Sequence, residues 1–173
     1  MDANARAMLV VTGAGVYSRL PQEEAVMSST RAELQDIAER YLEMWRRRDP
    51  AGIGQHYAPD GVAESPTYAT LRGRRAIEDA ARAFFTSFPD FALEVEATVI
   101  DPPLIAIFTT VNATHMNEFF GLPGTGRRIE FRMSRLMKMN DDGLIAHERR
   151  VYDFTGLLVR IGVLRAKPAK PVD

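Results

Sequence analysis

The segment from His147 to Gly162 reads HERRVYDFTGLLVRIG, and its pattern is the most informative in the sequence. Its pattern predicts a strand from Leu144 to Phe154, a break at Thr155-Gly156, and then a short apolar helix. Side chains alternate between the two faces of a strand. Strict alternation therefore places one set on a shared face: Ile145, His147, Arg149, Val151 and Asp153. Three of these are ionisable, so the face either lines a pocket or is turned to water, and the segment alone leaves both possibilities open.

Three helices are predicted upstream of this segment. The first begins at a capping box, Thr30–Glu33, and continues with apolar residues at helical spacing to about Arg48. A shorter helix carries Ile53 to Tyr57 and ends in a turn at residues 58–61, where a glycine suits a positive φ. The third helix has its apolar face between Ile77 and Phe88.

The predicted strands follow mostly after the helices. Val62 to Tyr68 is expected to be a short edge strand, because Pro66 cannot donate to a ladder. From Phe91 the apolar period changes from helical to alternating, which predicts strands over about 91–99, 104–115 and 129–139. In the first of these, one apolar face is expected to hold Phe91, Leu93, Val95, Ala97 and Val99. The hairpin signal at residues 140–143 returns the chain into the decisive segment.

Helices grouped before a mostly antiparallel sheet indicate an α+β fold. A long sheet that curls around a helix forms a cone, and an apolar cone is typical of a ligand cavity. Residues 29–164 are expected to form this domain. Residues 1–28 are predicted to be a flexible, dispensable extension, although Leu9–Val11 could instead dock as an extra strand or lid, and residues 165–173 are predicted to be a flexible tail.

Composition argues against several classes of function. The 173 residues are 46% hydrophobic and 26% charged, as in globular domains, and their net charge of −1 gives no drive towards nucleic acid or anionic membranes. The chain has no cysteine, which excludes disulfides and thiolate chemistry and fits the expected cytoplasmic location. No apolar run reaches the roughly 18 residues of a membrane helix. Gly13-Ala14-Gly15 lacks a third glycine at Ser18, so no dinucleotide or other cofactor is expected.

Two local patterns resemble a known family. Residues 114–127 read THMNEFFGLPGTGR, which resembles the T-H-x-G-x-F-x-G-x-P-P-T-G-K/R pattern of SnoaL-like polyketide cyclases, a branch of the NTF2-like superfamily. The other pattern runs from Asp142-Gly143 through Asp153 to Ile161-Gly162, and it resembles the family's D-G-K-I, distant aspartate and L-L-x-Q-L-G. The resemblance covers about residues 30–164 and implies an NTF2-like cone, in which a curved, mostly antiparallel sheet wraps around N-terminal helices.

The sequence departs from the family pattern at four positions. Asn117 replaces a glycine and Gly124 replaces the second proline, and both changes are expected to reshape the mouth of the cavity. Arg160 stands where the family usually has glutamine, and Arg149 stands where an aromatic residue is common. A more cationic pocket than that of a typical cyclase is therefore expected.

The resemblance implies that Asp153 is the general acid/base of an aldol-type ring closure. A carboxylate on an apolar wall has a raised pKa, which makes it a better base for a carbon acid. His115 and Arg149 are the donors expected to hold the enolate oxygen. Two other readings stay open: Asp153 could pair with Arg149 or cap the following helix, and His115 could be structural.

The predicted function is that of a cofactor-independent cyclase or isomerase acting on a small, largely apolar carbonyl compound. A protein that binds such a compound without chemistry, and a dimeric scaffold, are the alternatives. An epoxide hydrolase is less favoured, because residues 130–135 lack the Arg-x-Asp pair that this mechanism needs. No metal site is expected, since nothing in the spacing of His115, His147 and Asp153 demands one. The residues expected to bind substrate are Arg149, His147, Trp45, Tyr41, Phe119, Arg135 and Met137.

A homodimer is expected to form through the outer face of the sheet, as in similar folds. The side chains opposite the proposed lining make a mixed surface that is typical of such interfaces. They are Thr110, Asn112, Arg132, Ser134 and Leu136.

Overall fold

A computed structural model of the chain describes residues 29–165, and all structural statements below concern this part. The predictions for residues 1–28 and for the tail from residue 166 lie outside the described residues. The elements follow the order α1 (Arg31–Arg47), α2 (Pro50–Gln55), β1 (Tyr57–Ser65), β2 (Ala69–Arg72), α3 (Gly73–Ser87), β3 (Ala92–Asp101), β4 (Leu104–Thr114), β5 (Arg128–Met139), β6 (Ile145–Val151) and α4 (Phe154–Arg160).

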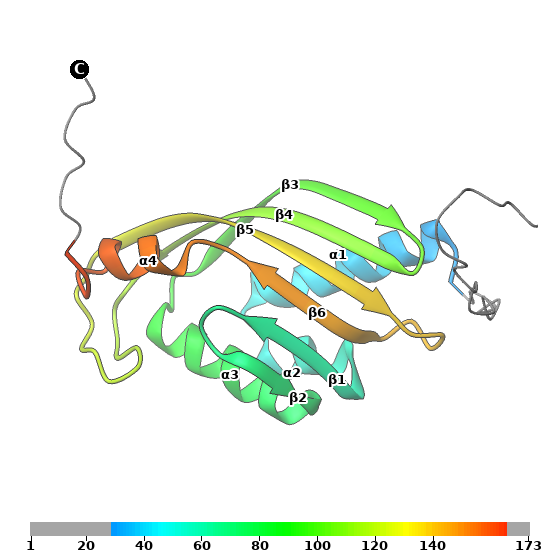
Figure 1. Cartoon of the computed structure of the whole chain (residues 1–173), viewed down its shortest axis with the longest axis horizontal. Coiled ribbons are helices and arrows are strands. Elements are labelled where there is room, and N and C mark those ends of the chain that lie inside the picture. The colour runs from blue at the N-terminus through cyan, green and yellow to red at the C-terminus, as the bar shows by residue number, and fades with distance from the viewer. Residues whose placement is uncertain (1–28, 166–173) are drawn as a thin grey trace, which may run out of the picture.

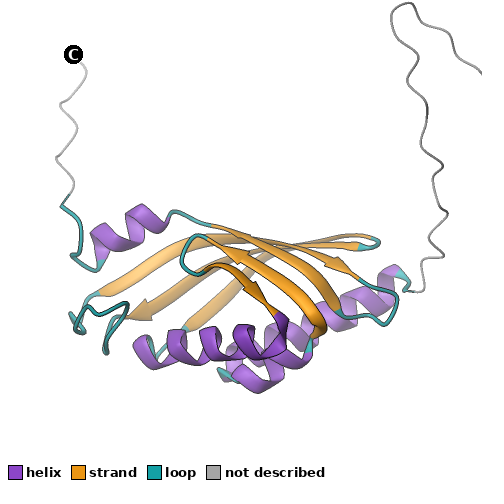
Figure 2. Cartoon of the chain, turned by 60° about the horizontal axis from the view of Figure 1, so that its bottom comes forward, coloured by secondary structure: helices purple, strands orange, loops and turns teal. Residues whose placement is uncertain are grey.

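One curved sheet carries the fold, and α1, α2 and α3 lie against its concave side (Figures 1 and 2). The strand order is β2-β1-β6-β5-β4-β3. Neighbouring strands are antiparallel except for β1 and β6, which run parallel. The expected α+β class, with a mostly antiparallel sheet wrapped around N-terminal helices, is confirmed.

The first helix begins as its capping box predicts. The hydroxyl of Thr30 accepts a hydrogen bond from the Glu33 backbone N–H, and the Glu33 carboxylate accepts one from the Thr30 backbone N–H. These bonds satisfy backbone donors that the first turn of a helix leaves free. The apolar stripe of α1 then packs under the sheet through Leu34, Tyr41 and Trp45, which are buried.

The second helix and the first strand differ from the prediction. Helix α2 begins earlier, because the Asp49 side chain caps the Gly52 N–H and Pro50 suits the first helical position. Residues 57–61 consequently belong to β1 and not to a helix and a turn. Strand β2 was not predicted. It pairs with the end of β1 and forms the edge of the sheet.

Two irregularities in strand pairing reverse the predicted faces of two strands. In β3 the register shifts between Val95 and Ala97, so Glu96 is an extra residue relative to β4. In β6 the register shifts between Ile145 and His147, so Ala146 is an extra residue relative to β5. An extra residue in one strand of a pair is a β-bulge, and it changes which face the following side chains occupy.

The bulge at Ala146 therefore decides what faces the concave side. Ile145 is buried before it, but Glu148 is the buried residue after it, three positions later. His147, Arg149 and Val151 point to the outer face. The prediction that they share an inner face with Ile145 is wrong, because strict alternation does not survive the bulge. The predicted inner positions of Ala97 and Val99 are wrong for the same reason.

We predict that inserting an alanine between His147 and Glu148 destabilises the domain far more than substituting Ala146. The insertion shifts every later residue of β6 by one position, which turns Glu148 outward and leaves Arg135 buried without its counter-charge. Breaking a buried ion pair costs about 3–5 kcal/mol, so the free energy of unfolding in urea should fall by at least that amount. The matched Ala146→Ser change keeps the register and should stay within about 1 kcal/mol of wild type. Equal stability of the two variants would show that the network does not depend on the register of β6.

Candidate functional site

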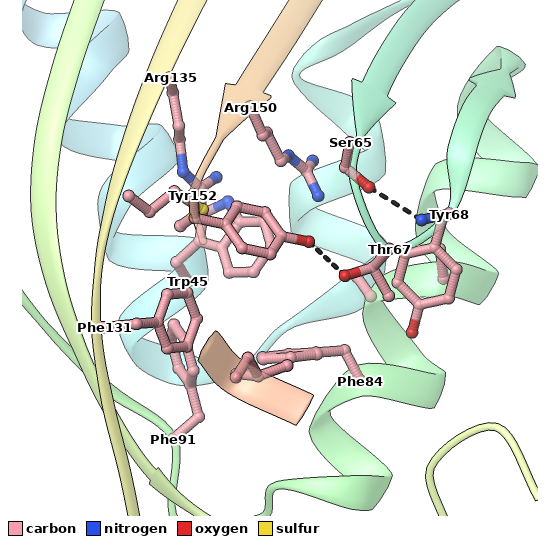
Figure 3. A pocket seen from close by; sticks show the side chains of 14 residues that line it. Trp45, Ser65, Thr67, Tyr68, Phe84, Phe91, Phe131, Arg135, Arg150 and Tyr152 are labelled. Carbon is pink, nitrogen blue, oxygen red and sulfur yellow. Dashed lines mark hydrogen bonds between the residues drawn. The ribbon is translucent and has the colours of Figure 1, made fainter. Parts of the chain in front are cut away.

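A narrow pocket lies between the concave face of the sheet and the helices (Figure 3). Its cavity volume is about 40 Å3. The pocket is therefore narrow, and we call it the slot. Its lining comes from α1, α3, α4, β5, β6, the end of β1 and the turn after it, with one residue just before β3 and one just after β6. The lining residues are Trp45, Ser65, Thr67, Tyr68, Ala80, Ala81, Phe84, Phe91, Phe131, Met133, Arg135, Arg150, Tyr152 and Leu157.

Aromatic rings form much of this wall. Phe91 lies between Trp45 and Phe84, with ring centroids 5.9 Å and 5.7 Å away, and Phe131 lies 5.4 Å from Tyr152. Rings at these distances and tilts attract one another and hold their positions. A slot with such walls suits a flat, apolar ligand.

Hydroxyl groups line another side of the slot. The Tyr152 hydroxyl is hydrogen-bonded to that of Thr67, and the Ser65 hydroxyl accepts a bond from the Tyr68 backbone N–H at 3.1 Å (Figure 3). Burial, together with the neighbouring Tyr152, raises the pKa of Tyr68 to about 12. Tyr68 therefore keeps its proton near neutral pH and can act as a neutral hydrogen-bond donor.

A buried charge network stands behind the pocket. The Glu148 carboxylate, fully buried, receives two tyrosine hydroxyls, Tyr41 at 3.2 Å on Oε1 and Tyr57 on Oε2. Arg150 donates to Oε2 from Nε at 2.8 Å, and its Nη2 lies 2.6 Å from the same oxygen and donates to the Tyr57 hydroxyl at 3.1 Å. Arg135 approaches Oε1 through Nη1 at 3.5 Å and also donates to the Tyr41 hydroxyl at 3.0 Å.

The network holds Glu148 as a carboxylate. Burial alone would raise its pKa, but Arg150 and Arg135 outweigh burial and lower the pKa of Glu148 to about 2. Burial and the Glu148 charge raise the pKa of Tyr57 well above its usual value. Both oxygens of Glu148 are engaged, and the group stays ionised near neutral pH. Glu148 is thus a structural anion and a poor proton acceptor.

Arg135 is the member of this network that keeps unused donors. Its side chain is completely buried and stacks on the indole of Trp45, with Cζ 3.9 Å from the ring centroid. Only Nη1 has hydrogen-bond partners, whereas Nε and Nη2 have none among the described residues. The indole Nε1 of Trp45 is a third buried donor without a partner. Buried polar groups are normally paired, so unpaired donors at a pocket wall point to a ligand.

The predicted site residues fall into separate groups. Trp45 and Arg135 line the slot, and Tyr41 supports it through the Glu148 network. Met137 is buried in the main core, and Phe119 belongs to a second apolar cluster at the end of the domain, beside Phe88 and Ile161. Neither Met137 nor Phe119 lines the slot.

His115 and Asp153 are also outside the slot. His115 is buried between Phe88 and Phe119, where its Nδ1 lies 3.2 Å from the Thr125 hydroxyl, and burial lowers its pKa. Asp153 is exposed and caps α4, because its carboxylate accepts the Gly156 N–H at 2.8 Å. The helix-capping alternative therefore describes Asp153. The two groups expected to perform the chemistry are not brought together.

The outer face of the sheet holds the remaining candidates. His147 lies 3.6 Å and Arg149 lies 3.1 Å from the carboxylate of Glu64, a partly exposed ion-pair group on β1. The predicted position of both residues in the cavity is wrong, owing to the bulge at Ala146. Arg150, Tyr152 and Glu148 take the inner positions instead, and alternation alone could not have found them.

The loop that carries the family motif closes one end of the domain. Gly124 lies against the backbone of Met116, where an added Cβ would stand 2.0 Å from the carbonyl oxygen. A side chain, and hence the proline of the family pattern, does not fit this path. Phe120 from the same loop packs on Tyr68, with ring centroids 5.3 Å apart. The loop thus contacts one wall of the slot through Phe120.

Within residues 29–165, no group of three or more histidine or acidic side chains is arranged to hold a metal ion. None of the helices in the same range is long and apolar enough to cross a membrane.

Comparisons with known proteins agree with this architecture. A sequence profile of the family described as SnoaL-like polyketide cyclase matches residues 35–161. No curated protein sequence matches the chain significantly. One similar solved structure is AclR of Streptomyces galilaeus, for which a hydroxylase activity has been suggested. AclR is 29% identical to this chain, and the alignment covers 79% of this chain and 100% of AclR with a TM-score of 0.69.

Two further structures show the fold alone. TsrD of Streptomyces laurentii is 23% identical, with a TM-score of 0.69 over 79% of this chain and 99% of TsrD. IdmH of Streptomyces antibioticus, a suggested polyketide cyclase, is 24% identical, with a TM-score of 0.64 over 75% of this chain and 99% of IdmH. These likenesses confirm the expected NTF2-like cone.

We predict that Glu148→Gln destabilises the protein by about 3–5 kcal/mol, because it leaves two buried guanidinium groups without their counter-charge. Thermal unfolding should shift down by roughly 10 °C. The matched control is Glu64→Gln, which removes the same group from an exposed ion pair and should change stability by less than about 1 kcal/mol.

The pH dependence of stability tests the Glu148→Gln variant in a second way. The unfolded chain protonates Glu148 near its ordinary pKa of about 4.3, whereas the folded chain does so near 2. Glu148 therefore stabilises the wild type fully above about pH 5, and that stabilisation is lost as pH falls towards 2. Glu148→Gln should lack this component. A variant as stable as wild type, with the same acid transition, would contradict the network.

Proposed function

Because the chain belongs to the SnoaL-like polyketide cyclase family, we propose that it is a cofactor-independent cyclase or isomerase that acts on a flat, largely apolar carbonyl compound. One observation carries the proposal: the buried guanidinium of Arg135 lies on the wall of an aromatic slot with two N–H donors unpaired. Cyclases and isomerases of this kind pass through enolates, whose negative oxygen needs such a donor.

The physical basis is electrostatic stabilisation in a dry site. Removing a proton from carbon next to a carbonyl places negative charge on the carbonyl oxygen. A fixed positive group in a water-excluding pocket stabilises that charge more than bulk water does, because it needs no reorganisation as the charge develops. Arg135 is fixed by Tyr41, Glu148 and the Trp45 ring, so it meets this requirement.

In this proposal Arg135 takes the role that the family resemblance gave to His115 and Arg149. The hydroxyls of Tyr68 and Tyr152 are the groups placed to meet a second ligand oxygen. Asp153 is not the base, since it caps α4 at the surface. The described lining contains no carboxylate or imidazole, and the proton therefore passes to solvent at the open mouth of the slot or to a basic group of the substrate.

The same observation about the lining favours a second candidate function. A pocket without a resident base suits a protein that binds a flat carbonyl compound without transforming it. The two functions differ in whether the wild-type protein accelerates proton removal from a compound that it binds.

Proton exchange tests the proposal without knowledge of the natural substrate. In D2O, the wild type should accelerate the loss of the α-protons of 2-tetralone, followed by NMR, above the rate in buffer. Arg135→Met should reduce this protein-dependent rate by about 100-fold or more, the usual effect of removing an oxyanion donor. Asp153→Asn keeps the helix cap and should remain within about threefold of wild type.

Arg149→Met is the matched control, since it removes an arginine from the outer face of the neighbouring strand. It should leave the exchange rate unchanged. Loss of exchange in Asp153→Asn with retention in Arg135→Met would overturn the proposed roles. Binding of 2-tetralone without any acceleration would establish the binding function instead. Fluorescence reports that binding directly, because Trp45 is the only tryptophan of the chain and lines the slot.

We further propose that the protein is a homodimer formed through the outer face of the sheet. Phe108, Leu136 and Val151 are exposed on adjacent strands of this face, at 40%, 45% and 59%. Arg132 and Glu96 lie beside them and pair at 3.5 Å. An apolar centre with both charge signs near it can match a second copy of itself about a two-fold axis.

Light scattering at micromolar concentration should give the mass of a dimer for the wild type and that of a monomer for Leu136→Glu. Val163→Glu, a change of the same kind at an exposed apolar residue away from the sheet, should remain a dimer. A monomeric wild type would refute the proposal.

A further inference from the structure

The unpaired donors of Arg135 are arranged as a pair. In a guanidinium group, Nε–H and the Nη2–H bond on the same edge run parallel to each other. Among the described residues, Arg135 has partners only for Nη1, which lies on another edge and contacts Tyr41 and Glu148. The edge formed by Nε and Nη2 is therefore complete and unused, although it is fully buried.

The neighbouring arginine shows what such an edge binds in this protein. On Arg150, the same edge faces the Glu148 carboxylate: Nε donates to Oε2 at 2.8 Å, and Nη2 lies 2.6 Å from the same oxygen. Two parallel N–H donors on a planar cation fit a planar anion with two oxygens better than a single carbonyl oxygen. The free edge of Arg135 thus has the geometry of a second carboxylate site.

Charge balance leads to the same ligand. Arg135 and Arg150 carry two positive charges, and Glu148 carries the single negative charge among the groups of residues 29–165 that contact them. Both tyrosine hydroxyls of the network donate to Glu148 and add no charge. One positive charge is consequently left uncompensated in a buried site, where an unpaired charge is unfavourable. A ligand with one negative charge would neutralise it, and a neutral ligand would not.

We propose that the compound bound in this slot presents a planar, two-oxygen monoanion to the Nε/Nη2 edge of Arg135, with its flat ring system between the aromatic walls. The inference rests on the proposed function for the choice of the slot as the ligand site. The anion has two chemical sources, a carboxylate or the enolate of a 1,3-dicarbonyl group. The first would be an anchor beside the reacting centre, and the second would be the reacting group itself.

Binding of small flat probes, measured by quenching of Trp45 fluorescence, tests the inference. 2-Naphthoate should bind the wild type at least tenfold more tightly than its methyl ester, if carboxylates are recognised. 2-Acetyl-1-tetralone should bind as its enolate at least tenfold more tightly than 1-tetralone, if 1,3-dicarbonyls are recognised. Either preference supports the inference and identifies the source of the anion. Equal binding of each anion and its neutral partner overturns it.

Two variants show whether the edge itself is responsible. Arg135→Lys keeps the charge but loses the parallel donors, so the preference for the anion should fall below about threefold while binding of the neutral partner stays within about threefold. Arg149→Met should keep the full preference. A preference retained in Arg135→Lys would show that charge alone is recognised and would overturn the two-donor geometry.

A pH titration of the wild type keeps the test valid if the Arg135 variant does not fold. The preference for 2-naphthoate over its ester should disappear as the naphthoate is protonated near its own pKa of about 4. Glu148 does not interfere, because Arg150 and Arg135 hold its pKa at about 2. A preference for 2-naphthoate that persists after the naphthoate is protonated would also overturn the inference.

The outcome is separable from that of the proposed function. Anion selectivity without proton exchange would keep the ligand class and remove the catalytic assignment. Proton exchange that depends on Arg135 without anion selectivity would keep the catalytic assignment and remove the ligand class. If none of the probes quenches Trp45 at millimolar concentration, the slot is not the ligand site and both proposals fail.

Discussion

A carboxylate with no exposure to water sits at the centre of this domain, and the surrounding structure is arranged around its charge. Glu148 is matched by two arginines and two tyrosines that come from α1, β1, β5 and β6. Burying an ion is unfavourable by several kcal/mol unless its partners are well placed. The network therefore fixes how the first helix meets the sheet, and it holds the guanidinium that gives the pocket its polarity.

Much of the fold was predictable because it depends on local patterns. The capping box at Thr30 marked the start of α1, the hairpin signal at residues 140–143 marked the turn between β5 and β6, and the change of apolar period at Phe91 marked the first long strand. The pocket was less predictable. A one-residue bulge leaves no reliable trace in the alternation of a short strand, yet the bulge at Ala146 determines whether Arg149 or Arg150 faces inward. Trp45 and Arg135 were found in spite of this, since their own elements are regular.

The chemistry of the slot differs from what the family resemblance suggested. The resemblance placed an acid/base aspartate at position 153, where the structure has a surface helix cap. The described lining instead consists of aromatic rings, small or flexible apolar side chains, hydroxyl groups and two arginines. Such a lining offers hydrogen bonds and positive charge to a ligand and provides no strong base. The same cone thus holds a different set of groups from those expected, which illustrates why a shared fold does not fix a reaction.

The Glu148 network joins residues that are far apart in the sequence, and this affects how the chain folds. Its hydrogen bonds join residues that are 107 and 91 positions apart, from Tyr41 and Tyr57 to the last strand. Contacts between such distant parts of a chain slow folding, because a large loop must close before they form. During synthesis, α1 and β1 leave the ribosome long before β6. The hydroxyls of Tyr41 and Tyr57 therefore stay hydrated until the Glu148 carboxylate is available. The charged centre of the domain is therefore among the last parts to form.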